Sequence, residues 1–365
     1  MIIGILREIK KDEYRVAMLP VGFELLKKDG NRILFQKGAG LGSGYGDDAY
    51  MAAGAELINS TAEVYAQAEM IVKVKEPQSE EIEQFRPGLV VFCYFHFAGS
   101  RELTEACLKK RIAAVAYETL TDEQGHLPLL TPMSEVAGKM SIQEGAKCLE
   151  KPMMGRGILL GGVSGVAPAN VLIIGGGVVG TNAARVAAGL GANVIIMDIN
   201  LDRLRYLDSM MPLNVTTVYC DPRAIQRYAA TADLVVGAVL VPGGKAPVLI
   251  DRHIVKRMKK GSVLVDVSID QGGCCETSRP TTHSDPVFIV DGVVHYCVTN
   301  MPGAVGRTST QALCNATLPY CRELAGMGLD TFVKRSAGRA VALNMRNGKL
   351  LCPAVAEAFP DMPRS

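Results

Sequence analysis

Residues 171–180, Val171-Leu172-Ile173-Ile174-Gly175-Gly176-Gly177-Val178-Val179-Gly180, decide the fold of this 365-residue chain. Four apolar residues typical of a buried strand lead into the glycines, and the alanine-rich residues 181–190, which Gly191 can end, have the composition of a helix. In such a unit Gly175 permits the tight turn, Gly177 lets backbone amides reach a diphosphate, and Gly180 lets the helix pack closely on the strand. The helix N-terminus adds a partial positive charge. We predict a dinucleotide site with contacts at Gly175, Gly177, Val178 and Gly180; a turn that binds nothing is the alternative.

The segment after this turn indicates which dinucleotide binds. Residues 193–197 form the next apolar strand, which ends at Asp198. A carboxylate at this place can accept hydrogen bonds from the adenosine ribose and repel a 2′-phosphate, so NAD is favoured over NADP. Arg203 and Arg205 follow closely and could in principle hold that phosphate, which leaves NADP as the alternative.

Short apolar runs recur along the chain between segments of helix length. They lie at residues 2–6, 33–35, 71–74, 89–95, 171–174, 194–197, 234–239 and 263–267. Strands separated by helices imply parallel β-α-β units, because a parallel pair needs a long crossover connection. The predicted fold class is α/β.

The order of these signals predicts two Rossmann-like domains. Four of these strand signals fall between Val171 and Val267, and a further one lies at residues 294–298, which matches a complete doubly wound, dinucleotide-binding sheet. A helix with Thr131 as its cap and Pro132 at its first position would link the domains, and helical residues after about 306 could return to the first. We expect an NAD-binding domain at residues 129–306, inserted in a discontinuous substrate domain at residues 1–128 and 307–365. Residues 360–365 read as a frayed tail.

Composition excludes several classes of protein. A hydrophobic fraction of 48% over this length allows two cores, and a net charge of +2 offers no excess to hold nucleic acid. The ten cysteines are scattered and include no CxxC spacing, which favours reduced thiols. The N-terminus lacks the features of a signal peptide, and no apolar run approaches the ~20 residues of a membrane helix. We expect a cytoplasmic protein.

Two cations are candidates for binding a substrate carboxylate. Arg15 follows the first strand, where its guanidinium could clamp a carboxylate in bidentate fashion; a surface arginine is the alternative. Lys75 ends the run Val72-Lys73-Val74-Lys75, but strand alternation places Lys73 on the same face, and spacing cannot choose between them.

Two further side chains are candidates for proton transfer. His96 closes the apolar run at residues 90–97, close to the strand end where ligand sites of α/β proteins lie, although a lone histidine there is more often a satisfied core residue. Asp270 follows the strand at residues 263–267 and precedes two glycines. Asp266 competes with it, but a carboxylate inside a strand would need specific partners.

Together these segments resemble the alanine dehydrogenase family, which also includes the NAD-binding part of proton-translocating transhydrogenase. The resemblance covers nearly the whole chain. The motifs that carry it are EYRVA up to Ala17, GAGLGSGYGDDAY from Gly38, KVKEP from Lys73, PLLTPMSEVAG from Pro128, GGGVVG from Gly175, GAVLVPGGKAP from Gly237, VDVSIDQGG from Val265, SRPTT from Ser278 and YCVTNMPGAV from Tyr296.

The resemblance implies a role for each candidate. Arg15 and Lys75 would bind the substrate carboxylate, while His96 and Asp270 would serve proton and water chemistry in the deamination of L-alanine, in a cleft between the domains. NAD contacts would come from Ser134, Asp198, Arg203, Val239, Leu240, Val267, Ser268, Ile269, Asp270, Arg279, Val298, Thr299, Asn300 and Met301. Cys220 stands where relatives commonly place a serine near the adenosine, which puts that contact in doubt.

The resemblance also bears on metals, assembly and rivals. Some relatives carry a histidine four residues after the position of Glu323; here Met327 stands there, so no metal is predicted. A homohexamer is the family expectation. One rival is the transhydrogenase subunit, which would lack an amino-acid site and need membrane partners; the joint presence of Arg15, Lys75 and His96 disfavours it. Another is a protein that binds NAD without catalysis.

Overall fold

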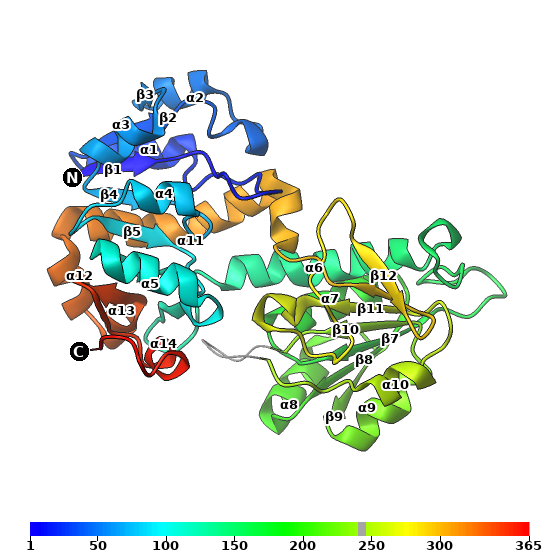
Figure 1. The fold of residues 1–365 in the computed structure, drawn as a ribbon. Coiled ribbons are helices and arrows are strands. Elements are labelled where there is room, and N and C mark those ends of the chain that lie inside the picture. Colours follow the sequence, from blue (N-terminus) through cyan, green and yellow to red (C-terminus); the bar gives the residue numbers. More distant parts are fainter. Residues whose placement is uncertain (240–245, 365) are drawn as a thin grey trace. The chain divides into compact units, whose positions relative to one another are not determined.

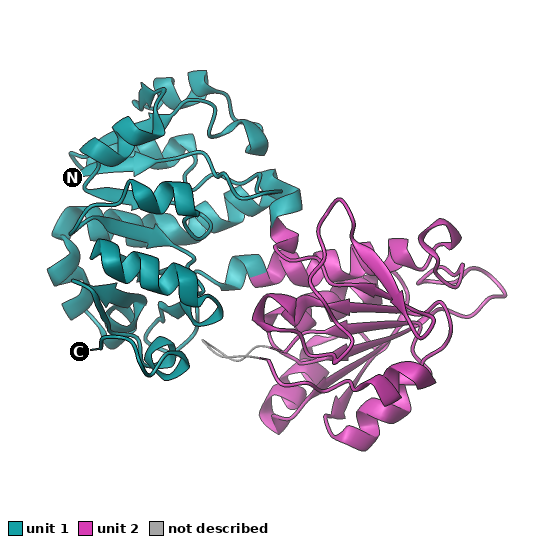
Figure 2. Cartoon of the chain, viewed as in Figure 1, with its two compact units in different colours: residues 1–133, 242–244, 303–365 teal, residues 134–241, 245–302 magenta. Residues whose placement is uncertain are grey.

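The computed structural model describes residues 1–239 and 246–364, and these divide into two compact units (Figures 1 and 2). The first unit contains residues 1–133 and 303–364, and the second contains the described residues between 134 and 302. Helix α6 (Thr131–Cys148) and the 3-10 helix η6 (Met301–Val305) run across the two boundaries. Among the described residues, no helix has the length and apolar character needed to cross a membrane.

The first unit is built on a sheet in the order β15-β14-β6-β5-β4-β1-β2-β3. Strands β1 to β6 pair in parallel, whereas β14 and β15 run antiparallel to their neighbours. The strands are β1 (Ile2–Ile5), β2 (Arg32–Gln36), β3 (Glu56–Ile58), β4 (Met70–Val72), β5 (Val90–Cys93), β6 (Ala113–Ala116), β14 (Leu343–Arg346) and β15 (Lys349–Leu350). The helices are α1 (Pro20–Lys28), α2 (Asp47–Ala52), α3 (Thr61–Gln67), α4 (Ser79–Glu83), α5 (Arg101–Lys110), α11 (Gly306–Met327), α12 (Leu329–Lys334), α13 (Ala337–Ala342) and α14 (Pro353–Ala358), with short 3-10 turns η1 (Leu41–Ser43), η2 (Phe97–Gly99) and η3 (Tyr117–Thr119).

Alternation along β5 divides the core of this unit between two faces of the sheet. Val91 and Cys93 belong to a buried cluster that also holds residues of α3 and α5. Phe92 points the other way and packs edge-on against Tyr117, with ring centroids 4.4 Å apart. Both faces of β5 are therefore buried, as expected for a strand inside a parallel sheet.

The second unit has the strand order of a complete dinucleotide-binding sheet, β12-β13-β11-β10-β7-β8-β9. Its strands are β7 (Asn170–Ile174), β8 (Asn193–Asp198), β9 (Val215–Tyr219), β10 (Leu234–Gly237), β11 (Val263–Asp266), β12 (Val287–Val290) and β13 (Val293–Tyr296). Pairing is parallel except between β12 and β13. The helices are α7 (Val178–Gly189), α8 (Leu201–Met210), α9 (Pro222–Ala229) and α10 (Arg252–Arg257), with 3-10 turns η4 (Lys151–Met153) and η5 (Val267–Gln271).

Strand β7 is buried on both faces and so fixes where the helices pack. Leu172 and Ile174 join a core cluster with residues of α9 and α10. Ile173 points to the opposite face, where a Cβ built on Gly180 of α7 would lie 3.2 Å from its Cγ2 atom. The sequence-based α/β prediction is confirmed.

Several predicted strand boundaries change in the structure. The runs 71–74 and 89–95 stop being strand at Val72 and Cys93. The reason is that carboxylates capture the next amides: Glu8 accepts the Val74 N–H at 2.7 Å, and Glu118 accepts the His96 N–H at 2.7 Å. The runs 234–239 and 263–267 end at Gly237 and Asp266, where side chains again accept the amides that follow: the Ser268 hydroxyl that of Val239, and Asp266 that of Ser268.

Two local predictions are wrong. Thr131 lies inside α6, and its hydroxyl donates to the Leu127 carbonyl at 3.0 Å, so it does not act as the predicted cap. The C-terminal residues are not a frayed tail, because the Leu350 N–H donates to the Pro363 carbonyl at 2.8 Å and Met362 is buried.

Candidate functional site

The glycine turn joins β7 to α7. A Cβ on Gly175, where φ is 104°, would lie 2.4 Å from the Ala238 carbonyl oxygen, and one on Gly180 would lie 1.8 Å from the Gly175 carbonyl oxygen. A Cβ on Gly177 would meet nothing within 4 Å. The chain therefore needs Gly175 and Gly180 for its own backbone and packing. The bare Gly177 instead leaves open space where α7 begins at Val178, which fits a bound diphosphate.

Asp198 and Arg203 hold the middle of this turn. Asp198 ends β8, and its Oδ2 atom accepts the Gly176 N–H at 2.7 Å. Arg203 donates from Nε to the Gly176 carbonyl at 2.6 Å and from Nη2 to Thr181 Oγ1 at 2.7 Å. Both predicted NAD contacts thus fix the shape of the turn itself. Arg205, the other arginine considered for a 2′-phosphate, pairs with Asp202 at 2.5 Å.

Most other predicted cofactor contacts lie where parallel strands of the second sheet end. Cys220 follows β9, Val239 follows β10, and η5, which includes Ser268, follows β11. Hydrogen bonds join neighbouring members of this set: Cys220 N–H to the Asp198 carbonyl at 3.0 Å, and Ser268 Oγ to the Val239 carbonyl at 2.7 Å. The structure therefore brings these positions to one edge of the sheet, the edge at which α/β sheets bind ligands.

The remaining predicted contacts are placed less uniformly. Val298, Thr299, Asn300 and Met301 follow β13, and the Thr299 N–H donates to the Thr281 carbonyl at 3.2 Å. Ser134 is half-buried in the first turn of α6, and Arg279 stacks on Phe288 with 4.3 Å from Cζ to the ring centroid. Among the described residues, no hydrogen bond or ion pair joins either side chain to the glycine turn. Leu240 lies outside the described residues.

In the first unit, three adjacent strands bring the other candidates to one sheet edge. The order β5-β4-β1 places the carboxyl ends of these parallel strands side by side. Arg15 follows β1, Lys75 follows β4 and His96 follows β5. The segments after β4 and β5 touch, since the Tyr94 N–H donates to the Val74 carbonyl at 3.1 Å.

The structure distinguishes the two lysines that spacing could not separate. Lys73 is fully buried and pairs with Glu8 at 3.0 Å and Glu81 at 2.8 Å. Burial lowers the pKa of Lys73, but these two carboxylates outweigh burial, so its pKa lies above the ordinary value. Lys75 is 7% exposed, and within the described residues no hydrogen bond or ion pair engages its ammonium. Lys75 is therefore the lysine free to meet an anionic ligand.

Arg15 is held by a carboxylate two residues away. Its Nε and Nη2 atoms donate to Glu13 Oε1 and Oε2 at 2.6 and 2.5 Å, and Nη1 lies 3.0 Å from the Met133 sulfur. Burial lowers the pKa of Arg15, yet the pairing with Glu13 raises it further, so the guanidinium stays charged. Glu13 thus engages the Nε and Nη2 atoms, and the Met133 sulfur lies against Nη1.

His96 has a strained backbone held by Glu118. Its φ is 52°, in the left-handed region, and the Glu118 carboxylate accepts the N–H groups of both His96 and Phe95. The imidazole is half-buried and lies parallel to the Tyr94 ring, with centroids 5.8 Å apart. His96 is therefore not a satisfied core residue, which was the alternative from sequence.

Asp270 and Asp266 also have different surroundings. Asp270 is exposed in η5, whereas Asp266 at the end of β11 has no solvent exposure. The partners that a buried Asp266 requires lie in the segment that follows it, where the Cys274 N–H and the Ser278 hydroxyl donate to its carboxylate.

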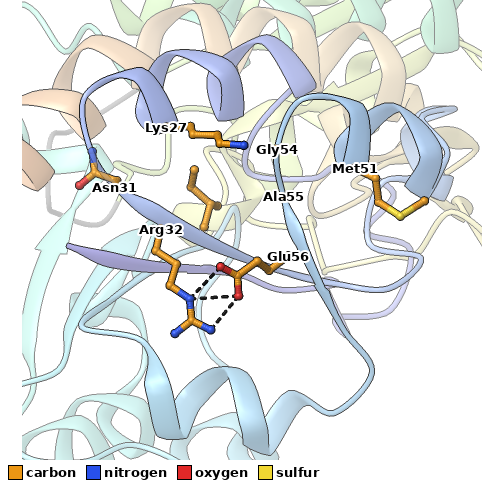
Figure 3. Close-up of a pocket in the computed structure, with 8 residues that line it drawn as sticks. Lys27, Asn31, Arg32, Met51, Gly54, Ala55 and Glu56 are labelled. Carbon is orange, nitrogen blue, oxygen red and sulfur yellow. Dashed lines mark hydrogen bonds and ion pairs between the residues drawn. The ribbon is translucent and has the colours of Figure 1, made fainter.

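A surface pocket in the first unit does not coincide with any of these positions (Figure 3). It is lined by Lys27, Asn31, Arg32, Ile33, Met51, Gly54, Ala55 and Glu56, and the exposed Arg32–Glu56 ion pair crosses it at 2.7 Å. It lies along β2 and the edge strand β3, two strands away from β4. No predicted site residue lines it.

Sequence reasoning missed the carboxylates that hold these groups. Glu13 is two residues from Arg15, but Glu8 and Glu118 are 66 and 22 residues from the amides that they accept. Only the strand order brings such distant positions together, so spacing alone gave no signal for them. Within the described residues, no cluster of three or more His, Cys, Asp or Glu side chains could hold a metal ion.

A doubly wound sheet with a glycine turn at the N-terminus of α7 defines a dinucleotide-binding protein of the α/β class. Comparison with known families identifies which one. The family described as "Alanine dehydrogenase/PNT, N-terminal domain" matches residues 4–137, and "Alanine dehydrogenase/PNT, C-terminal domain" matches residues 141–353. The chain belongs to the alanine dehydrogenase/PNT family, whose dehydrogenases bind a nicotinamide cofactor, and it is an oxidoreductase.

Individual relatives agree with this assignment. The chain is 51% identical over 364 residues to an alanine dehydrogenase of Methanococcus maripaludis, covering 100% of this chain and 97% of that one. It is 52% identical over 357 residues to that of Bacillus subtilis, covering 98% and 94%. A solved L-alanine dehydrogenase superposes with a TM-score of 0.93 at 47% identity, covering 99% of both chains. A transhydrogenase structure from Sinorhizobium meliloti, at 24% identity and a TM-score of 0.80 over 97% of this chain and 100% of that one, shares the fold.

Proposed function

We propose that this chain catalyses the NAD-dependent oxidative deamination of L-alanine to pyruvate and ammonium, and the reverse reductive amination. The observation that carries the proposal is Lys75, a buried ammonium without a hydrogen bond or ion pair among the described residues, at the sheet edge that also holds Arg15 and His96. A buried cation of this kind requires an anion, and a small carboxylate meets that requirement. The relatives named alanine dehydrogenase supply the identity of the carboxylate.

The NAD site would be formed by the second unit. The open space at Gly177, the N-terminus of α7 and the turn fixed by Asp198 and Arg203 support a diphosphate there. Because Arg203 and Arg205 are already engaged, neither stands ready for a 2′-phosphate, which supports NAD over NADP. When bound, NAD would accept the hydride from Cα of alanine.

Different side chains of the chain would bind the substrate and transfer the protons. Lys75 and the Arg15 guanidinium would hold the substrate carboxylate. Loss of the hydride from alanine leaves an imine, which water attacks. His96 would take the proton from that water and return one to the departing ammonia, while Asp270 would position the amine, the water or the imidazole. The overall reaction converts L-alanine, NAD⁺ and water to pyruvate, ammonium, NADH and a proton.

The same proposal assigns roles to the two predicted domains. Residues 1–128 and 307–365 would bind the amino acid, residues 129–306 would bind NAD, and the reaction would take place in a cleft between them, because a hydride moves only between atoms in contact. We further propose a cytoplasmic homohexamer without membrane or nucleic-acid partners. The cysteines, all free thiols, support a reducing compartment, and light scattering of the purified protein would test the assembly.

An absorbance assay for NADH tests the reaction. Alanine, serine, glycine, lactate and malate are offered with NAD⁺ or NADP⁺, and pyruvate with ammonium is offered with NADH. We expect alanine with NAD⁺ to be the best pair. Turnover of lactate without turnover of alanine would overturn the proposal, and no activity with any amino acid would favour a protein that binds NAD without catalysis.

Substitution of His96 tests its assigned role. We expect His96→Ala to lower kcat by about 100-fold or more, the usual contribution of a general acid–base. His253→Ala, at an exposed position on α10, is the matched control and should keep the parent rate. Near-normal turnover by His96→Ala would show that the proton is handled elsewhere.

A further inference from the structure

The carboxylate of Asp266 is the buried centre of the segment that follows β11. Its Oδ1 atom accepts the Ser268 N–H at 3.1 Å and lies 3.5 Å from the Cys274 sulfur. Its Oδ2 atom accepts the N–H groups of Cys274 and Cys275 at 3.0 and 3.2 Å and the Ser278 hydroxyl at 2.6 Å. Donors from both ends of residues 268–278 therefore converge on one side chain that has no contact with solvent.

Two glycines allow the segment to come this close. A Cβ on Gly273, where φ is 81°, would lie 2.8 Å from Asp266 Oδ2. A Cβ on Gly237 of β10 would lie 2.3 Å from the Cys274 sulfur. The backbone then closes on itself, because the Gly273 N–H donates to the Ser268 carbonyl at 3.1 Å. Packing and hydrogen bonding thus specify a single path for the chain around the carboxylate.

The site requires a group that only accepts hydrogen bonds. Backbone amides and a hydroxyl point at both oxygens, so an asparagine would bring an NH₂ group against donors. Burial raises the pKa of Asp266 and the donated hydrogen bonds lower it, with burial the larger effect. No cation pairs with Asp266 among the described residues, so the amides and the hydroxyl are what compensate the buried group.

This arrangement matters because of what the segment carries. Residues 267–270 hold predicted NAD contacts, and Asp270 lies between the two anchored ends, Ser268 and Cys274. Within the described residues no hydrogen bond or ion pair holds the Asp270 side chain, which is exposed. Its position is therefore set by the backbone of η5. Ser268 extends the same control to Val239, whose N–H and carbonyl it contacts at 3.1 and 2.7 Å.

We propose that Asp266 is a positioning residue, which fixes the backbone of residues 267–275 and so places Asp270 for the reaction. This inference rests on the proposed role of Asp270. Asp266 touches neither substrate nor cofactor itself; it acts through the segment that it holds.

The test compares Asp266→Asn with Asp233→Asn. Asp233, also a buried carboxylate, precedes β10 at the opposite end of the strands and pairs with Lys259 at 2.8 Å. We expect Asp266→Asn to lower kcat with alanine by about 10- to 100-fold, since small displacements of a catalytic group have effects of this size. ADP-ribose, which lacks nicotinamide, should still bind within about threefold of the parent, because the turn at Gly176 is unchanged. Asp233→Asn should lose thermal stability but keep kcat.

A double-mutant cycle separates positioning from a general loss of structure. If Asp266 acts through Asp270, Asp266→Asn in an Asp270→Asn background should change kcat by less than about twofold. Additive losses in the cycle, or loss of ADP-ribose binding in Asp266→Asn, would overturn the inference. If Asp270→Asn alone retained the parent kcat, the proposed function of Asp270 would fail instead, so the two failures are distinguishable.

A milder variant covers the case in which Asp266→Asn does not fold. Ser278→Ala removes the 2.6 Å hydrogen bond to Asp266 and leaves the charge and the backbone amides in place. We expect a smaller fall in kcat, about three- to tenfold, with ADP-ribose binding unchanged. An unchanged kcat in this variant would contradict the proposal.

Discussion

Two buried lysines that follow the same strand differ in whether the protein itself pairs their charge. Lys73 and Lys75 follow β4, two residues apart, and both are buried. Lys73 satisfies its charge inside the protein with Glu8 and Glu81. Lys75 keeps its ammonium without an ion-pair partner in the described chain. A buried cation is costly unless paired, so Lys75 is the position at which a ligand would contribute most.

We expect Lys75→Met and Lys73→Met to fail in different ways. Lys75→Met should lower kcat/KM for alanine by about 10- to 100-fold, the loss of one charge-assisted hydrogen bond, while its melting temperature stays near that of the parent. Lys73→Met leaves two buried carboxylates unpaired and should lower the free energy of unfolding by about 3–5 kcal/mol. Steady-state kinetics with urea unfolding measures both; a destabilised Lys75→Met with unchanged kcat/KM would reverse the assignment.

At the scale of the element, the β7–α7 unit uses its glycines for two different purposes. Gly175 and Gly180 accommodate neighbouring backbone, at 2.4 and 1.8 Å from a Cβ that each lacks. Gly177 faces open space. The glycines of this motif therefore have different roles. Gly175 and Gly180 are needed for folding, whereas the fold alone does not require Gly177.

Alanine substitutions should separate these purposes. Gly180→Ala places a Cβ against the Gly175 carbonyl and should destabilise the protein by roughly 1–3 kcal/mol, the usual cost of overpacking. Gly177→Ala should leave the unfolding midpoint unchanged but weaken NADH binding by at least about tenfold, or 1.4 kcal/mol. Gly189→Ala, later in α7 with nothing within 4 Å of its Cβ, is the control for helix propensity. Equal NADH affinity in Gly177→Ala and the parent would remove Gly177 from the diphosphate site.

Element type was predictable wherever an apolar run and a turn signal coincided. The runs around β7, β8, β10 and β11 gave the second sheet, and 3.6-residue periodicity with Pro132 gave α6. The segment Ala113–Ala116 gave no signal, because short alanine-rich runs favour helix, yet it is the strand β6 in the middle of the first sheet. Tertiary pairing between β5 and β14 overrides that local preference.

Site residues were predictable when their chemistry lies at a strand end, and not when it depends on contacts distant in sequence. Arg15, Asp198 and the pair Lys73 and Lys75 could be named as candidates because charged groups follow apolar strands there, but spacing did not choose between the two lysines. The partners Glu8 and Glu118 could not, because they reach across the sheet to amides that the sequence does not mark. The role of Asp266 likewise appears only when Cys274 and Ser278 fold back onto it.

For the whole molecule, the two units have separate hydrophobic cores and separate sets of candidate residues. The cluster around Ile71 and Val91 belongs to the first unit, and that around Leu172 and Leu264 to the second. Arg15, Lys75 and His96, proposed for the amino acid, lie in the first unit, whereas Asp270 and the described positions proposed for the dinucleotide lie in the second. Ligand binding should therefore stabilise the units differently.

Hydrogen exchange with and without ligands can measure this division. NADH at 100 times its dissociation constant stabilises whatever binds it by about 2.7 kcal/mol, which slows exchange through unfolding by roughly 100-fold. We expect NADH alone to protect the amides of β7, α7 and residues 267–275, with little change in β1, β4 and β5. Pyruvate added to the NADH complex should then protect residues near Lys75 and His96. Protection of the first sheet by NADH alone would contradict the assigned domain roles, as would pyruvate effects confined to residues 134–302.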